Sequence, residues 1–206
     1  MEQISVSLSD EDRMILESYK TLAEGLSEYL GSSYEIVLHS LEDLDRSVIK
    51  ILNGYHTGRR EGAPITDLAL EMLSRIRETG DTPYISYFTK NKKDEPLKSS
   101  TIAIKGREGR VIGLLCMNCY LNTPLADILS AFTPPASAGM SETFSDTSGD
   151  MIENTVVQVR EQVMSDPGIA ASAKNRAIVT ALYEKGIFNL KDAVVRTASL
   201  LNISRN

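Results

Sequence analysis

The apolar residues in the first part of the chain recur at the spacing of one helical face. They are Ile15, Tyr19, Leu22, Leu26 and Tyr29. Residues three and four apart lie on the same side of an α-helix, so this pattern predicts one amphipathic helix over residues 10–30. Ser9 stands where a helix is commonly capped and Gly31 where one commonly ends, which supports both boundaries.

From residue 34 onward the apolar period changes from helical to alternating, which is typical of strands. The predicted strands cover residues 34–40, 48–53, 84–90, 97–105 and 110–120. A helix is predicted over residues 66–78, between the second strand and the third. Since the strands come in hairpins, we expect antiparallel pairing. The order of elements predicts an α+β sensor-type domain over residues 10–125.

The remainder of the chain has a different character. Residues 126–150 are rich in Pro, Ser, Thr and Gly, and this composition predicts a linker. A connecting helix is predicted over residues 151–165, followed by a small all-α domain over residues 170–206.

The last two predicted helices have the layout of the start of a helix-turn-helix. Residues 174–185 form a helical pattern that ends at Gly186, and residues 190–201 form an amphipathic one that leads into a turn. In that motif the helix after the turn enters a DNA groove. We therefore expect the recognition helix to lie beyond Asn206, so that the domain is truncated before it.

Composition and charge narrow the classes of protein. The chain has 206 residues, of which 42% are hydrophobic, and two cysteines, so we expect an ordinary core without a disulfide framework. No apolar run approaches the roughly 20 residues that cross a bilayer, and the first twelve residues are polar and acidic. We therefore expect a cytoplasmic protein.

The charge is unevenly divided along the chain. From Ser165 onward six basic residues face three acidic ones, so this tail carries +3 and the rest carries −9. An acidic body with a basic tail suits a regulator whose tail meets DNA phosphates.

Several segments resemble a known family. Residues 34–40, 51–59, 62–70 and 109–118 resemble the YheO-like PAS domain of bacterial transcriptional regulators. The stretch from Ile178 to Val194 resembles the helix-turn-helix domain that accompanies it, as in the D-arginine utilisation regulators. The resemblance implies a PAS-like, five-stranded antiparallel sheet with flanking helices. It also implies a DNA-binding transcriptional regulator in which a small-molecule sensor controls the helix-turn-helix.

A PAS-type domain binds its ligand between the sheet and the crossover segment, and this gives a set of candidate ligand contacts. They are His39, Asn53, Gly54, His56, Arg59 and Asn118. The loop of residues 53–60 combines two glycines, an imidazole and two guanidinium groups, which suits a carboxylate or similar anion. We expect the effector to be an amino acid or related carboxylate. The alternative is that these side chains satisfy local backbone groups or belong to a solvated turn.

Cys116 and Cys119 have the C-x-x-C spacing, which raises the question of metal or redox chemistry. They follow an apolar run that predicts a strand, and side chains three apart on a strand point to opposite faces. With His39 and His56 they give four potential zinc ligands, without a second closely spaced pair. We therefore expect no metal site and no cofactor. The sequence has no phosphate loop and no nucleophile motif, so we do not expect an enzyme.

The tail residues best placed for phosphate contact share a basic or polar side chain near a helix end. They are Lys191, Arg196, Ser204, Arg205 and Asn206. For Lys191 and Arg196 the alternative is a solvated helix face.

We expect a homodimer, formed by the flanking helices. The alternative function is a PAS-type sensor or scaffold module that acts through protein–protein dimerisation without reading DNA. Its contact surface would be the apolar face of Val194, Val195, Ala198 and Leu201.

Overall fold

The computed structural model describes residues 5–79, 83–133 and 145–204. The chain divides into two compact units, residues 1–135 and 136–206. Each unit has its own hydrophobic core, and the two are described separately.

The first unit is an antiparallel sheet of five strands, as the hairpin pattern predicts. The strands are β1 (Tyr34–Ser40), β2 (Val48–Leu52), β3 (Tyr84–Lys90), β4 (Pro96–Lys105) and β5 (Val111–Tyr120). Their order in the sheet is β2-β1-β5-β4-β3, so the first and last strands of the chain lie side by side at its centre. Every pairing is antiparallel.

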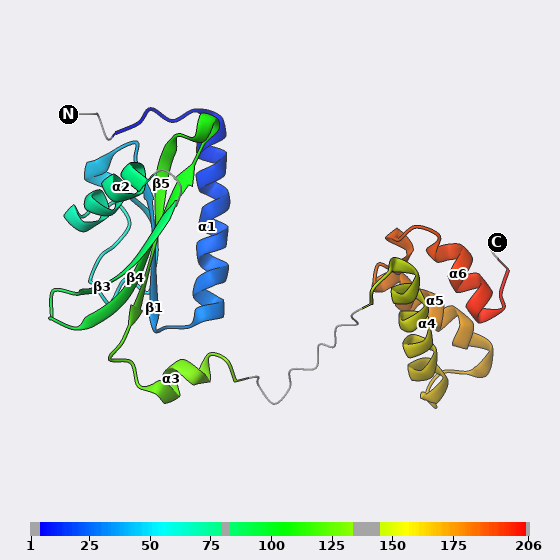
Figure 1. The fold of residues 1–206 in the computed structure, drawn as a ribbon. Coiled ribbons are helices and arrows are strands. Elements are labelled where there is room, and N and C mark those ends of the chain that lie inside the picture. The colour runs from blue at the N-terminus through cyan, green and yellow to red at the C-terminus, as the bar shows by residue number, and fades with distance from the viewer. Residues whose placement is uncertain (1–4, 80–82, 134–144, 205–206) are drawn as a thin grey trace. The chain divides into compact units, whose positions relative to one another are not determined.

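Helices lie on both faces of this sheet (Figure 1). The long helix α1 (Asp10–Leu30) packs against one face through Leu16 and Ala23, which meet Ile36 and Leu38 of β1. The crossover helix α2 (Asp67–Thr79) packs against the other face through residues that include Leu73 and Ile76. Because successive strand residues alternate between faces, β1 directs Glu35, Val37 and His39 toward the α2 side.

The start of α1 is fixed by a buried carboxylate. Asp12 is fully buried and forms a capping box with Ser9, and Arg110 donates to its Oδ2 at 2.7 Å. The backbone N–H and hydroxyl of Ser9, with smaller contributions from Arg107 and Arg110, hold the pKa of Asp12 below its ordinary value. The carboxylate therefore ties the helix to the turn between β4 and β5, where a Cβ on Gly106 would clash with Asp12 Oδ1.

Part of the predicted linker over residues 126–150 is helical. Helix α3 (Leu125–Ser130) follows β5, and the first unit extends to residue 135 rather than 125. Tertiary contacts with the end of α1 explain the difference. Phe132 packs edge-on against Tyr29 with ring centroids 6.0 Å apart, and a Cβ on Gly31 would lie 2.7 Å from that of Ala131.

The second unit is a bundle of three helices joined by short 3₁₀ turns. They are α4 (Ser148–Ser165), α5 (Lys174–Glu184) and α6 (Ala193–Leu201). The unit's core includes Ile152, Val156 and Val159 of α4 together with Ile178 and Leu182 of α5. The helix predicted over residues 151–165 is present as α4, and its apolar stripe forms part of the core of this unit.

The last helix also differs from its predicted span. The pattern of residues 190–201 is broken because Asp192 adopts a left-handed conformation, φ 63°, which no α-helix continues through. After α6, Asn202 is left-handed as well, φ 53°, and its N–H bonds to the carbonyls of Ala198 and Ser199. The predicted turn after residue 201 is thus present.

Candidate ligand-binding site

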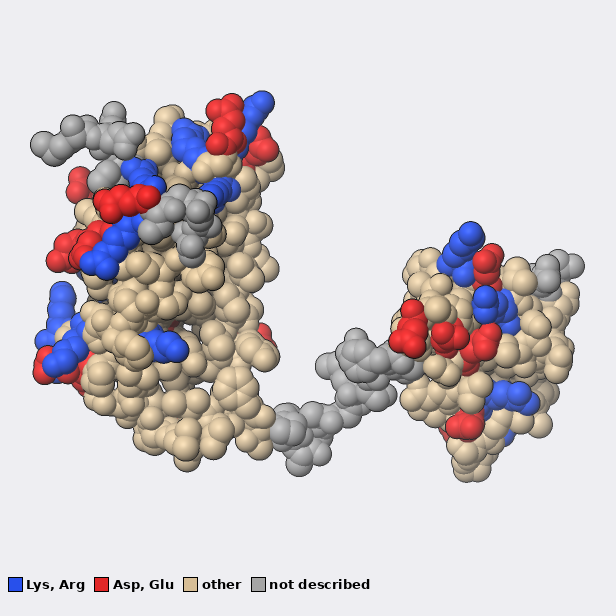
Figure 2. All heavy atoms as spheres, in the orientation of Figure 1, with Lys and Arg blue, Asp and Glu red and all other residues tan. Residues whose placement is uncertain are grey.

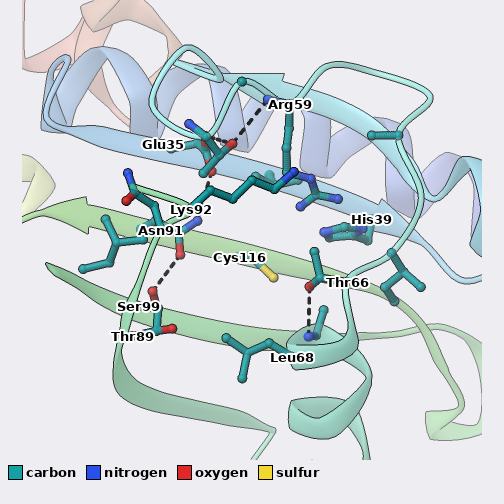
Figure 3. Close-up of a pocket in the computed structure, with 18 of the residues that line it drawn as sticks. Glu35, His39, Arg59, Thr66, Leu68, Thr89, Asn91, Lys92, Ser99 and Cys116 are labelled. Carbon is teal, nitrogen blue, oxygen red and sulfur yellow. Dashed lines mark hydrogen bonds between the residues drawn. The ribbon is translucent and has the colours of Figure 1, made fainter. Parts of the chain in front are cut away.

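A cavity of about 710 Å³ lies on the α2 side of the sheet in the first unit. Its lining comes from β1, the crossover segment of residues 57–69, the β3–β4 hairpin and β5. The close-up shows side chains from all four of these segments directed into one space (Figure 3). The cavity is therefore built by elements far apart in the sequence.

Glu35 is the central polar anchor of this cavity. Its side chain is 1% exposed, yet three donors satisfy it. The hydroxyl and backbone N–H of Thr57 donate to its Oε2 at 2.6 and 3.3 Å, and Asn118 Nδ2 donates to its Oε1 at 3.1 Å. The amide of Asn118 is in turn fixed by Ser99, whose hydroxyl donates to its Oδ1 at 2.8 Å. A buried carboxylate with these partners holds the crossover loop against the sheet.

Arg59 follows Thr57 in the loop and faces the same cavity. Its Nη2 donates to the carbonyl of Pro64 at 2.6 Å, and its backbone N–H donates to the Thr57 hydroxyl at 3.4 Å. Among the described residues no carboxylate forms an ion pair with it. The loop therefore presents a guanidinium group that has no carboxylate at ion-pair distance in the described part of the chain.

The backbone of the loop passes so close to Gly54 that a larger residue would not fit at that position. A Cβ on Gly54 would lie 2.6 Å from the carbonyl oxygen of Arg59, closer than real Cβ contacts come. Gly54 therefore shapes the loop that carries Arg59, although the residue does not line the cavity.

His39 lies beside the loop and is 1% exposed. Its Nδ1 is 2.6 Å from the hydroxyl oxygen of Ser47. Burial, together with the charge of Arg59, lowers the pKa of His39 from its ordinary value of 6.5 to about 3. The imidazole is therefore neutral at physiological pH.

The strands form an apolar and weakly polar floor. Cys116 is buried, with its sulfur 3.6 Å from Thr101 Oγ1, and Thr101 also bonds to the Tyr87 hydroxyl at 3.0 Å. Burial is the main reason that the pKa of the Cys116 thiol rises to about 11. Cys119, three residues on, lies on the opposite face of β5, in line with Leu115 and Met117 of the α1-side core. The described residues contain no group of three or more His, Cys, Asp or Glu that could hold a metal ion.

The structure brings together three of the six predicted ligand contacts. His39, Arg59 and Asn118 line the cavity, whereas Asn53, Gly54 and His56 do not. Asn53 instead donates from Nδ2 to the carbonyl of Tyr34 at 2.7 Å and to Ser27 and Gly31, which ties the end of β2 to the end of α1. For Asn53 the alternative of satisfying local groups is the one observed.

His56 lines a second, smaller hollow. Its ring stacks on that of Tyr120 with centroids 3.9 Å apart, and its Nε2 lies 2.7 Å from the carbonyl oxygen of Ser32. The Tyr120 hydroxyl donates to the backbone carbonyl of His56 at 2.6 Å. The imidazole points away from the larger cavity because the loop turns over between residues 54 and 58, closed by a bond from Gly58 N–H to the carbonyl of Gly54.

The polar residues of the cavity that sequence reasoning missed include Glu35 and Lys92. Lys92, at the tip of the β3–β4 hairpin, extends across the cavity in the close-up (Figure 3). The signal for Glu35 was present: a carboxylate in phase with Val37 and His39, inside a strand that is otherwise apolar, needs specific donors.

The residues predicted to contact DNA differ in how exposed they are and in whether they are already paired. Lys191 and Ser204 are exposed, whereas Arg196 pairs with Glu153 of α4 at 3.0 Å. Arg205 and Asn206 lie outside the described residues. Of the four apolar residues proposed as a contact face, Val194 and Val195 are exposed, whereas Ala198 is buried and Leu201 packs against the unit's core.

The charge of the second unit differs from that of the predicted basic tail. Because α4 belongs to the unit, residues 136–206 hold seven basic and eight acidic residues, for a net charge of −1. In the view of Figure 2, acidic and basic side chains are mixed on the visible face of this unit. The +3 balance from Ser165 onward therefore does not describe a separate basic domain.

Five antiparallel strands in this order, with a cavity between the sheet and the crossover, define a PAS-type sensor domain, here followed by a helical domain. The YheO-like PAS domain model matches residues 9–134, and a helix-turn-helix domain model matches residues 151–206. The chain belongs to the YheO-like PAS family. These two domains suggest a sensor-linked DNA-binding regulator and are typical of regulators that are not enzymes.

Two relatives resemble the whole chain. "Uncharacterized protein YheO" of Escherichia coli (strain K12) is 47% identical over 194 residues, which is 93% of this chain and 81% of that protein. An "Uncharacterized protein" of Haemophilus influenzae is 43% identical over 201 residues, which is 96% of this chain and 90% of that protein.

Similar solved structures include PAS and light-oxygen-voltage (LOV) proteins. A PAS domain from Colwellia psychrerythraea is 15% identical with a TM-score of 0.35, and covers 50% of this chain and 99% of its own. The Rhodobacter sphaeroides LOV protein is 10% identical with a TM-score of 0.36, and the match covers 87% of this chain and 99% of that protein. None of the helices that the structure describes is both long and apolar enough to span a membrane.

Proposed function

We propose that the protein is a ligand-responsive transcriptional regulator. A small molecule bound in the PAS cavity alters how the helix-turn-helix domain binds DNA. The observation that carries this proposal is the cavity itself: it places Arg59, His39 and Lys92 against one space, on the same chain as a helix-turn-helix domain. Polar groups converging on a preformed cavity are typical of small-molecule sites.

The proposed mechanism is a shift between two states of a homodimer. Helix-turn-helix proteins commonly read two half-sites about one DNA turn apart, so a change in the spacing of two domains changes affinity. An effector shifts this equilibrium only as far as it binds one state more tightly. Because the DNA lies in the bacterial cytoplasm, we place the regulator there.

The test is DNA binding by the full-length protein, measured by fluorescence anisotropy on sequences enriched from a random pool. We expect the logarithm of affinity to fall linearly with the logarithm of salt concentration. Substitution K191Q removes an exposed cation and is expected to reduce that slope by about one. Substitution K93Q, in the β3–β4 hairpin of the first unit, removes the same charge and serves as the control. Failure to enrich any sequence above non-specific binding would refute the proposal.

A second function is favoured by one observation. Val194 and Val195 are 51% and 41% exposed on α6, which suits contact with a protein partner. In that case the module acts by assembly and not by reading DNA. Sedimentation of the chain beside a fragment that ends at Asp150 separates the two, because assembly through this surface disappears in the fragment.

A further inference from the structure

The hydrogen bonds around His39 determine which of its ring nitrogens carries the proton. Ser47 is fully buried, and among the residues that the structure describes its hydroxyl has one hydrogen-bond partner, Nδ1 of His39. A buried hydroxyl proton needs an acceptor, so Ser47 donates and Nδ1 accepts. The neutral ring therefore carries its proton on Nε2. Among the described residues Nε2 has no hydrogen-bond partner, so it is available as a donor on the cavity side.

Arg59 supplies the second set of donors. Apart from the bond from Nη2 to Pro64, its guanidinium has no partner among the described residues. The close-up shows the guanidinium of Arg59 and the ring of His39 directed into the same part of the cavity (Figure 3). Desolvation and then the charge of Arg59 lower the pKa of His39, in keeping with this placement.

The N-terminus of α2 also borders the cavity, but its first amides are already occupied. Asp67 Oδ1 accepts from the N–H of Leu68 at 2.8 Å, and Thr66 Oγ1 accepts from that of Ala69 at 3.1 Å. At this end of the cavity the donors left for a ligand are therefore those of Arg59 and His39, and Lys92 of the β3–β4 hairpin also lines the cavity. The guanidinium of Arg59 has donors only, and the one acceptor of the neutral His39 ring, Nδ1, is already used by Ser47.

We propose that this part of the cavity binds a single carboxylate group, held between the guanidinium of Arg59 and the Nε2–H of His39. An arginine fork and a neutral N–H donor together match the two oxygens of a carboxylate. A monoanion is favoured over a dianion such as phosphate because it balances the formal charge of the lining, in which the cations Arg59, Arg60, Lys90 and Lys92 outnumber the carboxylates Glu35, Glu61 and Asp67 by one. This site rests on the proposed function in one respect: its occupant is the carboxylate end of the effector.

Acetate is the probe, since it contains the proposed group and little else. It is titrated into the full chain at constant ionic strength, with sodium chloride as the matched salt, while NMR follows the side-chain N–H signals of Arg59 and His39. We expect saturable shifts of both with acetate and none with chloride. The affinity should fall about tenfold or more in R59Q and remain within twofold in R107Q, a surface arginine in the β4–β5 turn.

Further variants keep the test decisive if R59Q is poorly folded. Substitution R59K retains the charge without the fork and should weaken acetate binding severalfold, and S47A removes the donor that fixes the ring and should also weaken it. Nitrogen chemical shifts of the His39 ring report the tautomer directly. A proton on Nδ1, equal shifts with chloride, or unchanged acetate affinity in both Arg59 variants would each overturn the proposal.

The acetate experiment and the DNA-binding experiment can fail independently of each other. If acetate binds as expected and no DNA sequence is enriched, the carboxylate site stands and the regulator proposal fails. If DNA is bound and acetate is not, the regulator stands and its effector is not held through a carboxylate at this site.

Discussion

Individual residues in the PAS domain show how a polar cavity is kept inside a folded core. Glu35 is tolerated because three neutral donors surround it, and the same bonds fix the loop that carries Arg59. His39 is tolerated because it remains neutral. The cavity therefore has a hydrogen-bonded carboxylate on one side and the donors of Arg59 and His39 on the other.

The buried imidazole makes stability depend on pH. In the unfolded chain His39 takes up a proton below its ordinary pKa of 6.5, whereas in the folded protein it does so only near 3. Since the unfolded state binds the extra proton between these values, this residue lowers the free energy of unfolding as pH falls below 6.5. The loss is at most about 1.4 kcal/mol per pH unit, and above 6.5 the residue has no such effect.

Substitution H39N should therefore flatten this dependence. Asparagine keeps a hydrogen-bonding atom near the position of Nδ1 but does not titrate, so the slope of unfolding free energy against pH between 6.5 and 4 should be smaller. Urea denaturation across this range measures it, with each protein referred to its own value at pH 8. Equal slopes in the two proteins would show that His39 titrates normally.

Sequence reasoning placed some ligand contacts in the cavity correctly and others wrongly, and the difference has a physical reason. His39 and Arg59 could be found because a histidine on a strand and an arginine in a glycine-bearing loop are visible locally. Asn53 and His56 lie within the same loop, but its turn directs them elsewhere, and the turn depends on Gly54 approaching Arg59 at a distance that no local pattern encodes.

At the scale of elements, packing explains both the successes and the errors of sequence analysis. The five strands and α1 have strong periodicity, and their observed bounds agree with the predicted ones within one or two residues. Helix α3 has only six residues and depends on contacts with the distant end of α1. Helix α4 was predicted as an element, but its assignment to the core of the second unit depended on partners on α5 and α6.

The role of α4 in that core can be measured by truncating one side chain. Ile152 is fully buried, so I152A should lower the free energy of unfolding of the second unit by about 2–4 kcal/mol. Calorimetry of the full chain should show one transition shifted and the other unchanged. Substitution V157A, at a position on α4 that is 50% exposed, serves as the control and should change stability little. A similar loss in both variants would contradict the packing described for α4.

For the whole molecule, the division into two units means that each half carries its own stability. The sensor core and the helical core are built from residues of separate segments. The two should therefore unfold as independent cooperative units.

A fragment of residues 1–135 tests this independence. It should unfold at the same urea concentration as the corresponding transition of the full chain, with a difference of less than about 0.5 kcal/mol in free energy of unfolding. Circular dichroism in the far ultraviolet and tyrosine fluorescence, recorded together, follow the transition. A fragment that is markedly less stable would show that the sensor depends on the helical domain.

The two thiols occupy opposite faces of one central strand, and this gives the protein a built-in pair of reporters. Cys116 forms part of the cavity floor and Cys119 faces the α1 side, so an alkylating reagent meets them by different routes. Cys116 labels slowly because burial raises its thiol pKa, and occupation of the cavity should slow it further, with Cys119 as the internal reference. Mass spectrometry of the labelled peptide can then reveal ligands before any target gene is known.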